Sequence, residues 1–389
     1  KTYWEYPSEE RQAVSKEEFS RLFNNHISTA LKLEEKISLP LSGGMDTRTI
    51  LSACLIAREH LHCYTHGMES SPDVRIARRI AWMLRLPHDV YTLDDGWIKN
   101  IPATAVEQVE TFNGLLDLIR YLHLGNSYTR EQNKGTLFIA GIFGGELLRG
   151  YWVNDEVANV ASFDAVTVAL RKRMQYPVAR GVYRDFDGAE IDNFLTSAVR
   201  QELTGVEYKD YAPNFLSHSQ RLAGRYFKVY NPILYHRFIE QSPRLGLAEK
   251  KSGYLQRYII GMNSPALTRV LLATGQCVNE KEWLMRWQGY QAHMVRYFRG
   301  GVNLAARKLL GRQVFSTAYL VDYALWLRKY HRQYVREVLD YEQMMLKDFF
   351  YRPQLESAVN SFLDGRNELT HFITGLMSLE IWLRRALIK

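Results

Sequence analysis

Stretches with strand-like and helix-like patterns alternate through the first 151 residues. Apolar runs typical of buried strands lie at residues 37–41, 61–66, 88–93 and 136–140, and helix-compatible stretches separate them. Strands that alternate with helices at this spacing predict a parallel sheet with crossover helices. Ligands bind such sheets beyond the carboxyl ends of the strands. We therefore expect an α/β protein with a site at that edge.

Two of the helices have clear sequence signals. Ser15 followed by Glu18 is a capping-box start. The apolar residues after it fall on one helical face: Phe19, Leu22, Phe23, Ile27, Ala30 and Leu31. A second helix is expected from Asp73, with Val74, Ala77, Ile80, Ala81 and Leu84 facing inward.

The pattern changes after residue 151 to longer helices with aromatic faces, at 213–228, 255–262 and 319–339. We expect two parts: an α/β core over residues 1–151, and a mainly helical lobe over residues 152–389. The lobe would pack against the sheet and close over its ligand.

A glycine loop follows the first predicted strand. It reads Leu41-Ser42-Gly43-Gly44-Met45-Asp46-Thr47, and a helix-compatible stretch, 48–58, comes next. Glycine lacks Cβ, so the backbone can turn sharply and present N–H groups to an anion, and a helix start adds its own N–H groups. This pattern favours a pyrophosphate group, with Asp46 placed to hold Mg²⁺. A glycine pair on its own would predict only an ordinary tight turn.

The loop resembles the SGGxDS loop of the ATP pyrophosphatases, with Thr47 for the last serine. Segments 61–73 and 110–113 are similar to segments of asparagine synthetases. Segment 141–151, Gly-Ile-Phe-Gly-Gly-Glu-Leu-Leu-Arg-Gly-Tyr, is similar to their GEGSDExxxGY signature, and 376–385 resembles their closing helix. The chain is identified as a member of the asparagine synthetase family, covering its PP-loop synthetase domain without the glutaminase domain.

The resemblance implies an adenine nucleotide α-hydrolase-like fold and AMP-forming amide-bond synthesis. ATP would adenylate a carboxylate, and the acyl group of this adenylate would then be transferred to ammonia or an amine. It implies ATP and Mg²⁺ as cofactors, with Asp46 as metal ligand and Asp46, Glu146 and Lys251 as catalytic residues. The ATP-binding residues would be Leu41, Ser42, Gly43, Gly44, Asp46, Thr47, His66, Gly67, Ala140 and Gly141. His66 would contact adenine, or would only fill the strand end.

Several charged positions of the family are uncharged here. Ile142 and Gly145 replace a glutamate and the aspartate that shares the magnesium, and Phe143 replaces a glycine. Asn231 and Tyr235 replace an arginine and an aspartate.

The family's K-x-x-L-R spacing also fails. Lys251 or Arg257 could supply the missing cation, and two solvated lysines, Lys250 and Lys251, are the alternative. These losses support a second interpretation, a catalytically inactive nucleotide-binding or scaffolding member of a biosynthetic complex.

Composition narrows the partners. A net charge of +8 with pI near 9.2 would favour binding to nucleic acid or to another acidic partner. However, Trp326, Tyr330, Tyr334 and Val338 recur at helical spacing, so an amphipathic helix with a basic outer face explains the basic segment 328–336. We expect no nucleic-acid partner. No apolar run approaches the roughly 18 residues of a membrane span, so we expect no membrane partner.

Three cysteines without metal-ligand spacing indicate buried thiols in a reducing cytoplasm. The chain starts at Lys1, and Tyr3-Trp4 resembles the pair just before the family's synthetase domain. Two alternatives follow for the nitrogen donor. Either a glutaminase domain was removed, or the protein takes ammonia, an internal amine or a separate partner. The other substrate would be a small-molecule or peptide carboxylate.

Overall fold

A computed structural model describes residues 15–112, 117–149, 217–241, 253–278, 321–366 and 369–387, with single residues or short runs elsewhere, such as Lys250. The predictions made for Tyr3-Trp4, for Lys251 and for most of 152–216 lie outside the described residues.

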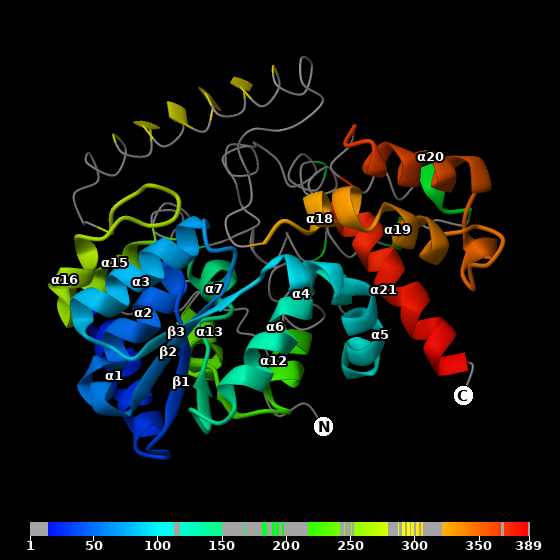
Figure 1. Ribbon diagram of the computed structural model, residues 1–389. Coiled ribbons are helices and arrows are strands. Elements are labelled where there is room, and N and C mark those ends of the chain that lie inside the picture. Colours follow the sequence, from blue (N-terminus) through cyan, green and yellow to red (C-terminus); the bar gives the residue numbers. More distant parts are fainter. Residues whose placement is uncertain are drawn as a thin grey trace.

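Five parallel strands form one sheet in the order β3-β2-β1-β4-β5 (Figure 1). Their bounds are β1 (Ile37–Pro40), β2 (Leu61–Gly67), β3 (His88–Thr92), β4 (Leu137–Ile139) and β5 (Lys228–Tyr230). The central strand β1 pairs Ile37 with Leu61 of β2 on one side and with Leu137 of β4 on the other. The α/β fold class and its four predicted strands are confirmed.

The edge strand β5 differs from the prediction, which continued a helix to residue 228. Lys228, Val229 and Tyr230 instead pair with β4, and the Lys228 N–H donates to the Thr136 carbonyl at 2.9 Å. A β-branched and an aromatic residue suit the open edge beside β4 better than a helix end. The sheet thus includes residues beyond 151.

One face of the sheet is covered by α1 (Lys16–Leu31), α2 (Met45–Cys54), α3 (Pro72–Leu84) and α15 (Tyr254–Asn263), which lie together in Figure 1. The Ser15 hydroxyl caps α1 by accepting from the Glu18 N–H at 3.2 Å, as predicted. Of the residues expected to face inward on α1 and α3, only Leu22 and Leu84 are half-exposed. α2 begins three residues before the predicted helix and ends at Cys54.

The other face is covered by α6 (Leu118–Glu131) and α12 (Ser217–Ala223), and α5 (Ile101–Phe112) and α21 (Thr370–Leu387) pack against α6. Side chains of β4 alternate between the two cores: Leu137 and Ile139 enter the first, Phe138 the second. The sheet is therefore buried on both faces, as a parallel sheet requires. α21 contains the segment 376–385.

The helix predicted at 319–339 is two helices, α18 (Tyr323–Tyr330) and α19 (Arg332–Val338). The break is at His331, whose Nε2 contacts the Ile98 carbonyl oxygen at 2.7 Å. Tyr330 is consequently 39% exposed rather than on the buried face with Trp326.

The remaining elements are short, apart from α20. They are η1 (Leu55–His60), α4 (Asp95–Lys99), α7 (Gly144–Arg149), η3 (Pro232–Leu234), α13 (His236–Gln241), α16 (Pro265–Thr268), η5 (Lys347–Phe349) and α20 (Arg352–Leu363). Cys54, Cys63 and Cys277 are buried, as expected. Within the described residues, no helix combines the length and apolar character needed to cross a bilayer.

Candidate nucleotide site

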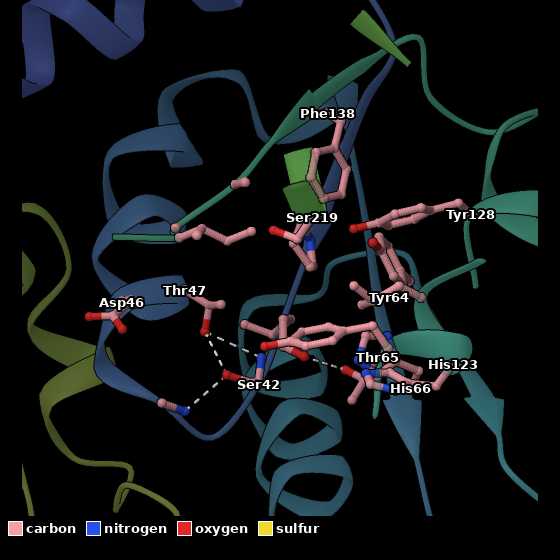
Figure 2. A pocket seen from close by; sticks show the side chains of 18 of the residues that line it. Ser42, Asp46, Thr47, Tyr64, Thr65, His66, His123, Tyr128, Phe138 and Ser219 are labelled. Atoms are coloured by element: carbon pink, nitrogen blue, oxygen red, sulfur yellow. Dashed lines mark hydrogen bonds between the residues drawn. The ribbon is translucent and has the colours of Figure 1, made fainter. Parts of the chain in front are cut away.

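The loop between β1 and α2 is held by its own hydroxyl groups. The Ser42 Oγ accepts from the Gly44 N–H at 3.1 Å and lies 3.0 Å from the Thr47 Oγ1, which also accepts from the Ser42 N–H (Figure 2). Gly44 starts α2 without a side-chain cap among the described residues. No capping side chain at Gly44 therefore competes for the first-turn N–H groups of α2, which leaves them available for an anion.

Gly43 holds the loop against its neighbours. Its N–H donates to the Asp73 Oδ1 at 2.7 Å, and its carbonyl accepts from the Ala273 N–H. A Cβ at this position would lie 2.9 Å from the Ala273 Cβ, so only glycine fits. Burial raises the pKa of Asp73, and the Gly43 N–H partly offsets this by stabilising its carboxylate. Gly43 does not line the cavity and acts through packing.

A cavity of about 380 Å³ opens at the carboxyl ends of β1, β2 and β4 (Figure 2). Nine of the predicted ATP-binding and catalytic residues line it: Leu41, Ser42, Gly44, Asp46, Thr47, His66, Ala140, Gly141 and Glu146. The structure thus brings together the loop, the end of β2 and the start of α7. Gly67 does not line the cavity.

One end of the cavity is aromatic. Tyr64, Tyr128 and Phe138 line it, together with His66 and His123 (Figure 2). The two histidine rings meet edge to face with centroids 4.6 Å apart. Burial lowers the pKa of His66 to about 4, so the ring is neutral at pH 7. Its Nδ1 is buried without a hydrogen-bond partner among the described residues, so a ligand could satisfy it.

His123 also belongs to this wall, although no sequence pattern predicted it there. It comes from α6, and its Nδ1 lies 3.0 Å from the Tyr323 hydroxyl of α18. Burial, then the neighbouring His66 and Arg120, hold its pKa well below the usual range. No spacing in the sequence links residues 66, 123 and 323, so only the fold reveals this contact.

The other end of the cavity is acidic, since Asp46 and Glu146 line it, and Arg149 and Gln256 contact Asp46. The Asp46 Oδ2 pairs with the Arg149 Nη2 at 2.8 Å, and its Oδ1 accepts from the Gln256 Nε2 at 2.7 Å. Burial and, to a smaller extent, the nearby Asp46 carboxylate raise the pKa of Glu146 to about 7. Sequence reasoning missed Arg149 and Gln256, although an arginine one helical turn after Gly145 was a usable signal.

Three of the substituted positions have packing roles. The Asn231 Nδ2 donates to the Ile142 carbonyl at 3.0 Å, and Tyr235 stacks on His26 at 4.0 Å. Phe143, where the family has glycine, keeps a left-handed backbone with φ of 75° and is buried. The uncharged residues at these positions therefore take part in packing and in the turn of the loop.

The segment expected to supply a cation does reach the site. Lys250 is 2% exposed, so its interpretation as a solvated lysine is wrong, and Arg257 is also buried. Gly253, with φ of 63°, lies so close to Met45 that a Cβ would be 2.8 Å from its sulfur. Gln256 then meets Asp46. Lys251, the predicted catalytic lysine, lies outside the described residues.

An uncapped helix start behind a glycine loop, at the carboxyl edge of a parallel sheet, is an arrangement in which α/β proteins bind phosphate groups and nucleotides. The family model described as "Asparagine synthase" matches residues 18–257, more than half of the chain. The chain belongs to the asparagine synthase family, whose members use ATP and Mg²⁺ in ATP-dependent amide synthesis.

Individual relatives are more distant. Asparagine synthetase [glutamine-hydrolyzing] from Rattus norvegicus is 26% identical over 140 residues, which cover 33% of this chain and 24% of that protein. The match thus spans about a quarter of the relative's length. Two solved structures are similar at 15% identity and a TM-score of 0.28. The match to the NH3-dependent NAD synthetase from Campylobacter jejuni covers 50% of this chain and 97% of that protein. The match to the NMN synthetase from Francisella tularensis covers 55% of this chain and 94% of that protein.

Proposed function

We propose that this protein binds ATP in the cavity and uses it to form an amide or amide-like bond, releasing AMP and pyrophosphate. The phosphates would bind the loop and the first turn of α2. Adenine would lie against His66, and ribose near Gly141. The observation that carries the proposal is the uncapped α2 start opening into a cavity whose other end is aromatic.

The reaction has two steps. A substrate carboxylate oxygen attacks the α-phosphorus of ATP, and the bond to pyrophosphate breaks. The amine nitrogen then attacks the acyl carbon of the adenylate, AMP leaves, and the nitrogen loses a proton. Positioning and neutralisation of phosphate charge would supply most of the rate.

Asp46 and Glu146 are the acidic groups that we propose for this chemistry, and Lys251 keeps its proposed role as a cation. Asp46 would orient the donors of Arg149 and Gln256 toward the phosphates. Glu146, with its raised pKa, could share a proton with the substrate near pH 7. The amine would be ammonia, either free or supplied by a glutaminase, or an amine of the substrate.

A specific observation also favours the inactive alternative. Asn231 and Tyr235 are engaged in packing contacts, and Arg149 already occupies Asp46, the acid of the glycine loop. Such a site could bind a nucleotide without turning it over, as a sensor or scaffold in a biosynthetic complex.

Exchange of labelled pyrophosphate into ATP distinguishes an active synthetase from the inactive alternative. It reports reversal of the adenylation step, and it should appear when the right carboxylate is supplied from a panel of amino acids and peptides. ATP binding by calorimetry without exchange for any member of the panel would favour the inactive alternative. No ATP binding under any condition would contradict both.

The magnesium site expected at Asp46 does not fit the residues present. Mg²⁺ prefers octahedral coordination by carboxylate, water and phosphate oxygens, but both Asp46 oxygens already accept hydrogen bonds, one of them from a guanidinium cation that would repel the metal ion. Gly145 offers no carboxylate. Within the part of the chain that the structure describes, no cluster of three or more His, Cys, Asp or Glu could hold a metal.

A further inference from the structure

The arrangement around Asp46 suggests what replaces the metal. Arg149, at the end of α7, places its Nη2 2.8 Å from the Asp46 Oδ2. The two side chains are 33% and 26% exposed, so the pair lies within reach of a solvent-borne ligand. A guanidinium cation thus stands against the carboxylate that the family resemblance assigns to Mg²⁺.

Gly145 makes room for this arginine. A Cβ at position 145 would lie 3.2 Å from the Arg149 Nη2 and 3.8 Å from the Asp46 Oδ2. An aspartate side chain there would enter the space that the guanidinium now uses. Since residues four apart lie on one helix face, the absence of an acid at position 145 and the arginine at position 149 affect the same space.

Arg149 retains donors for a ligand. A guanidinium has five N–H groups, and its planar fork matches phosphate oxygens. The Nε of Arg149 is buried and has no acceptor among the described residues. Gln256 holds the other Asp46 oxygen, which fixes the carboxylate and, through it, the arginine.

We propose that Arg149 is the resident cation of this site: it takes the place of the divalent ion beside Asp46 and binds the phosphate chain of a nucleoside triphosphate directly, so that nucleotide binding does not require a metal. This inference rests on the proposed nucleotide function. It concerns the binding step alone.

Calorimetric titration of the whole protein with ATP, in EDTA and in excess Mg²⁺, tests the proposal. The two dissociation constants should agree within about threefold. Arg149→Ala should weaken binding in EDTA by about tenfold or more, the size of a lost charge-assisted contact. Arg79→Ala removes the same charge from an exposed position on α3 and should bind ATP as the wild type does.

A second variant restores the metal arrangement. Gly145→Asp combined with Arg149→Ala places two carboxylates side by side, so binding should become weak in EDTA and recover with Mg²⁺. Melting curves establish that each variant is folded. If Arg149→Ala does not fold, Gly145→Asp alone serves: its new carboxylate competes for the guanidinium and should weaken binding in EDTA.

Failure of the role proposed for Arg149 and failure of the proposed nucleotide function give different results. Wild-type binding that disappears in EDTA, or Arg149→Ala binding that equals wild type there, overturns the role of Arg149 and leaves the nucleotide site standing. Absence of ATP binding in both buffers overturns the proposed function itself.

Discussion

At the scale of single residues, the cavity combines a neutral aromatic end with a charged end. His66 is the residue whose role is most open to test, because its Nδ1 is buried beside His123 without a partner among the described residues. Such a nitrogen is costly to bury unless a ligand bonds to it. This explains a polar ring at a position where the family resemblance implies only backbone and small apolar contacts with adenine.

We expect His66→Ala to weaken ATP binding by about three- to tenfold, the size of one hydrogen bond. His66→Phe keeps an aromatic ring but not the nitrogen, and it should lose a similar amount if the hydrogen bond dominates. His60→Ala, at an exposed position at the end of η1, is the matched control. Unchanged affinity in both His66 variants would show that this histidine only fills the strand end.

Phe143 shows what a substituted motif can conceal. Sequence comparison registers the loss of a glycine, whereas the backbone retains the left-handed φ of 75° that a glycine would adopt. Its buried ring packs in the core on the α1–α2 side of the sheet. Residue identity shows the loss of the glycine, but only the structure shows that the phenylalanine adopts a backbone conformation typical of glycine.

At the scale of elements, the long C-terminal helix α21 docks on α5 and α6 around a buried carboxylate. Asp117, which precedes α6, accepts from the Thr374 Oγ1 at 2.6 Å and lies 4.0 Å from the Arg120 guanidinium. Burial raises its pKa to about 7 in spite of these partners. Ionisation of this residue therefore opposes the docking of α21.

The raised pKa of Asp117 determines whether the protein becomes more or less stable as pH rises. Between about pH 4 and pH 7 the folded protein keeps a proton on Asp117 that the unfolded chain releases, so stability falls as pH rises through this window. Asp117→Asn removes the ionisation and should raise the melting temperature by about 4 °C or more at pH 8, with little change at pH 4. Exposed Glu107→Gln on α5 is the control. Equal pH dependence in Asp117→Asn and wild type would contradict this account.

Element positions were largely predictable, and element ends were not. Four strands and the start of α1 follow from local pattern and capping, which depend on neighbouring residues. β5 depends on pairing with β4, about 90 residues away, and the break at His331 depends on the Ile98 carbonyl. Likewise, the buried Glu131 of α6 forms hydrogen bonds with Ser38, His62 and Tyr91 from three different strands, which no local pattern reveals.

At the scale of the whole molecule, the loop, the strand ends and α7 were predictable as one site because parallel strands place their carboxyl ends at one edge. The ion pair between Arg149 and Asp46 was not, since it depends on side-chain space left by Gly145. The division into a core over 1–151 and a lobe over 152–389 stays a prediction. β5 shows, however, that the later part contributes to the sheet.

The identity of the products tests the central claim most directly. The protein is incubated with ATP, ammonia and the carboxylate that supports pyrophosphate exchange, and the phosphorus-containing products are resolved by ³¹P nuclear magnetic resonance. The account predicts AMP and pyrophosphate in equal amounts, formed only when the carboxylate is present. ADP with inorganic phosphate would contradict it, because cleavage would then occur at the γ-phosphorus and no adenylate would form.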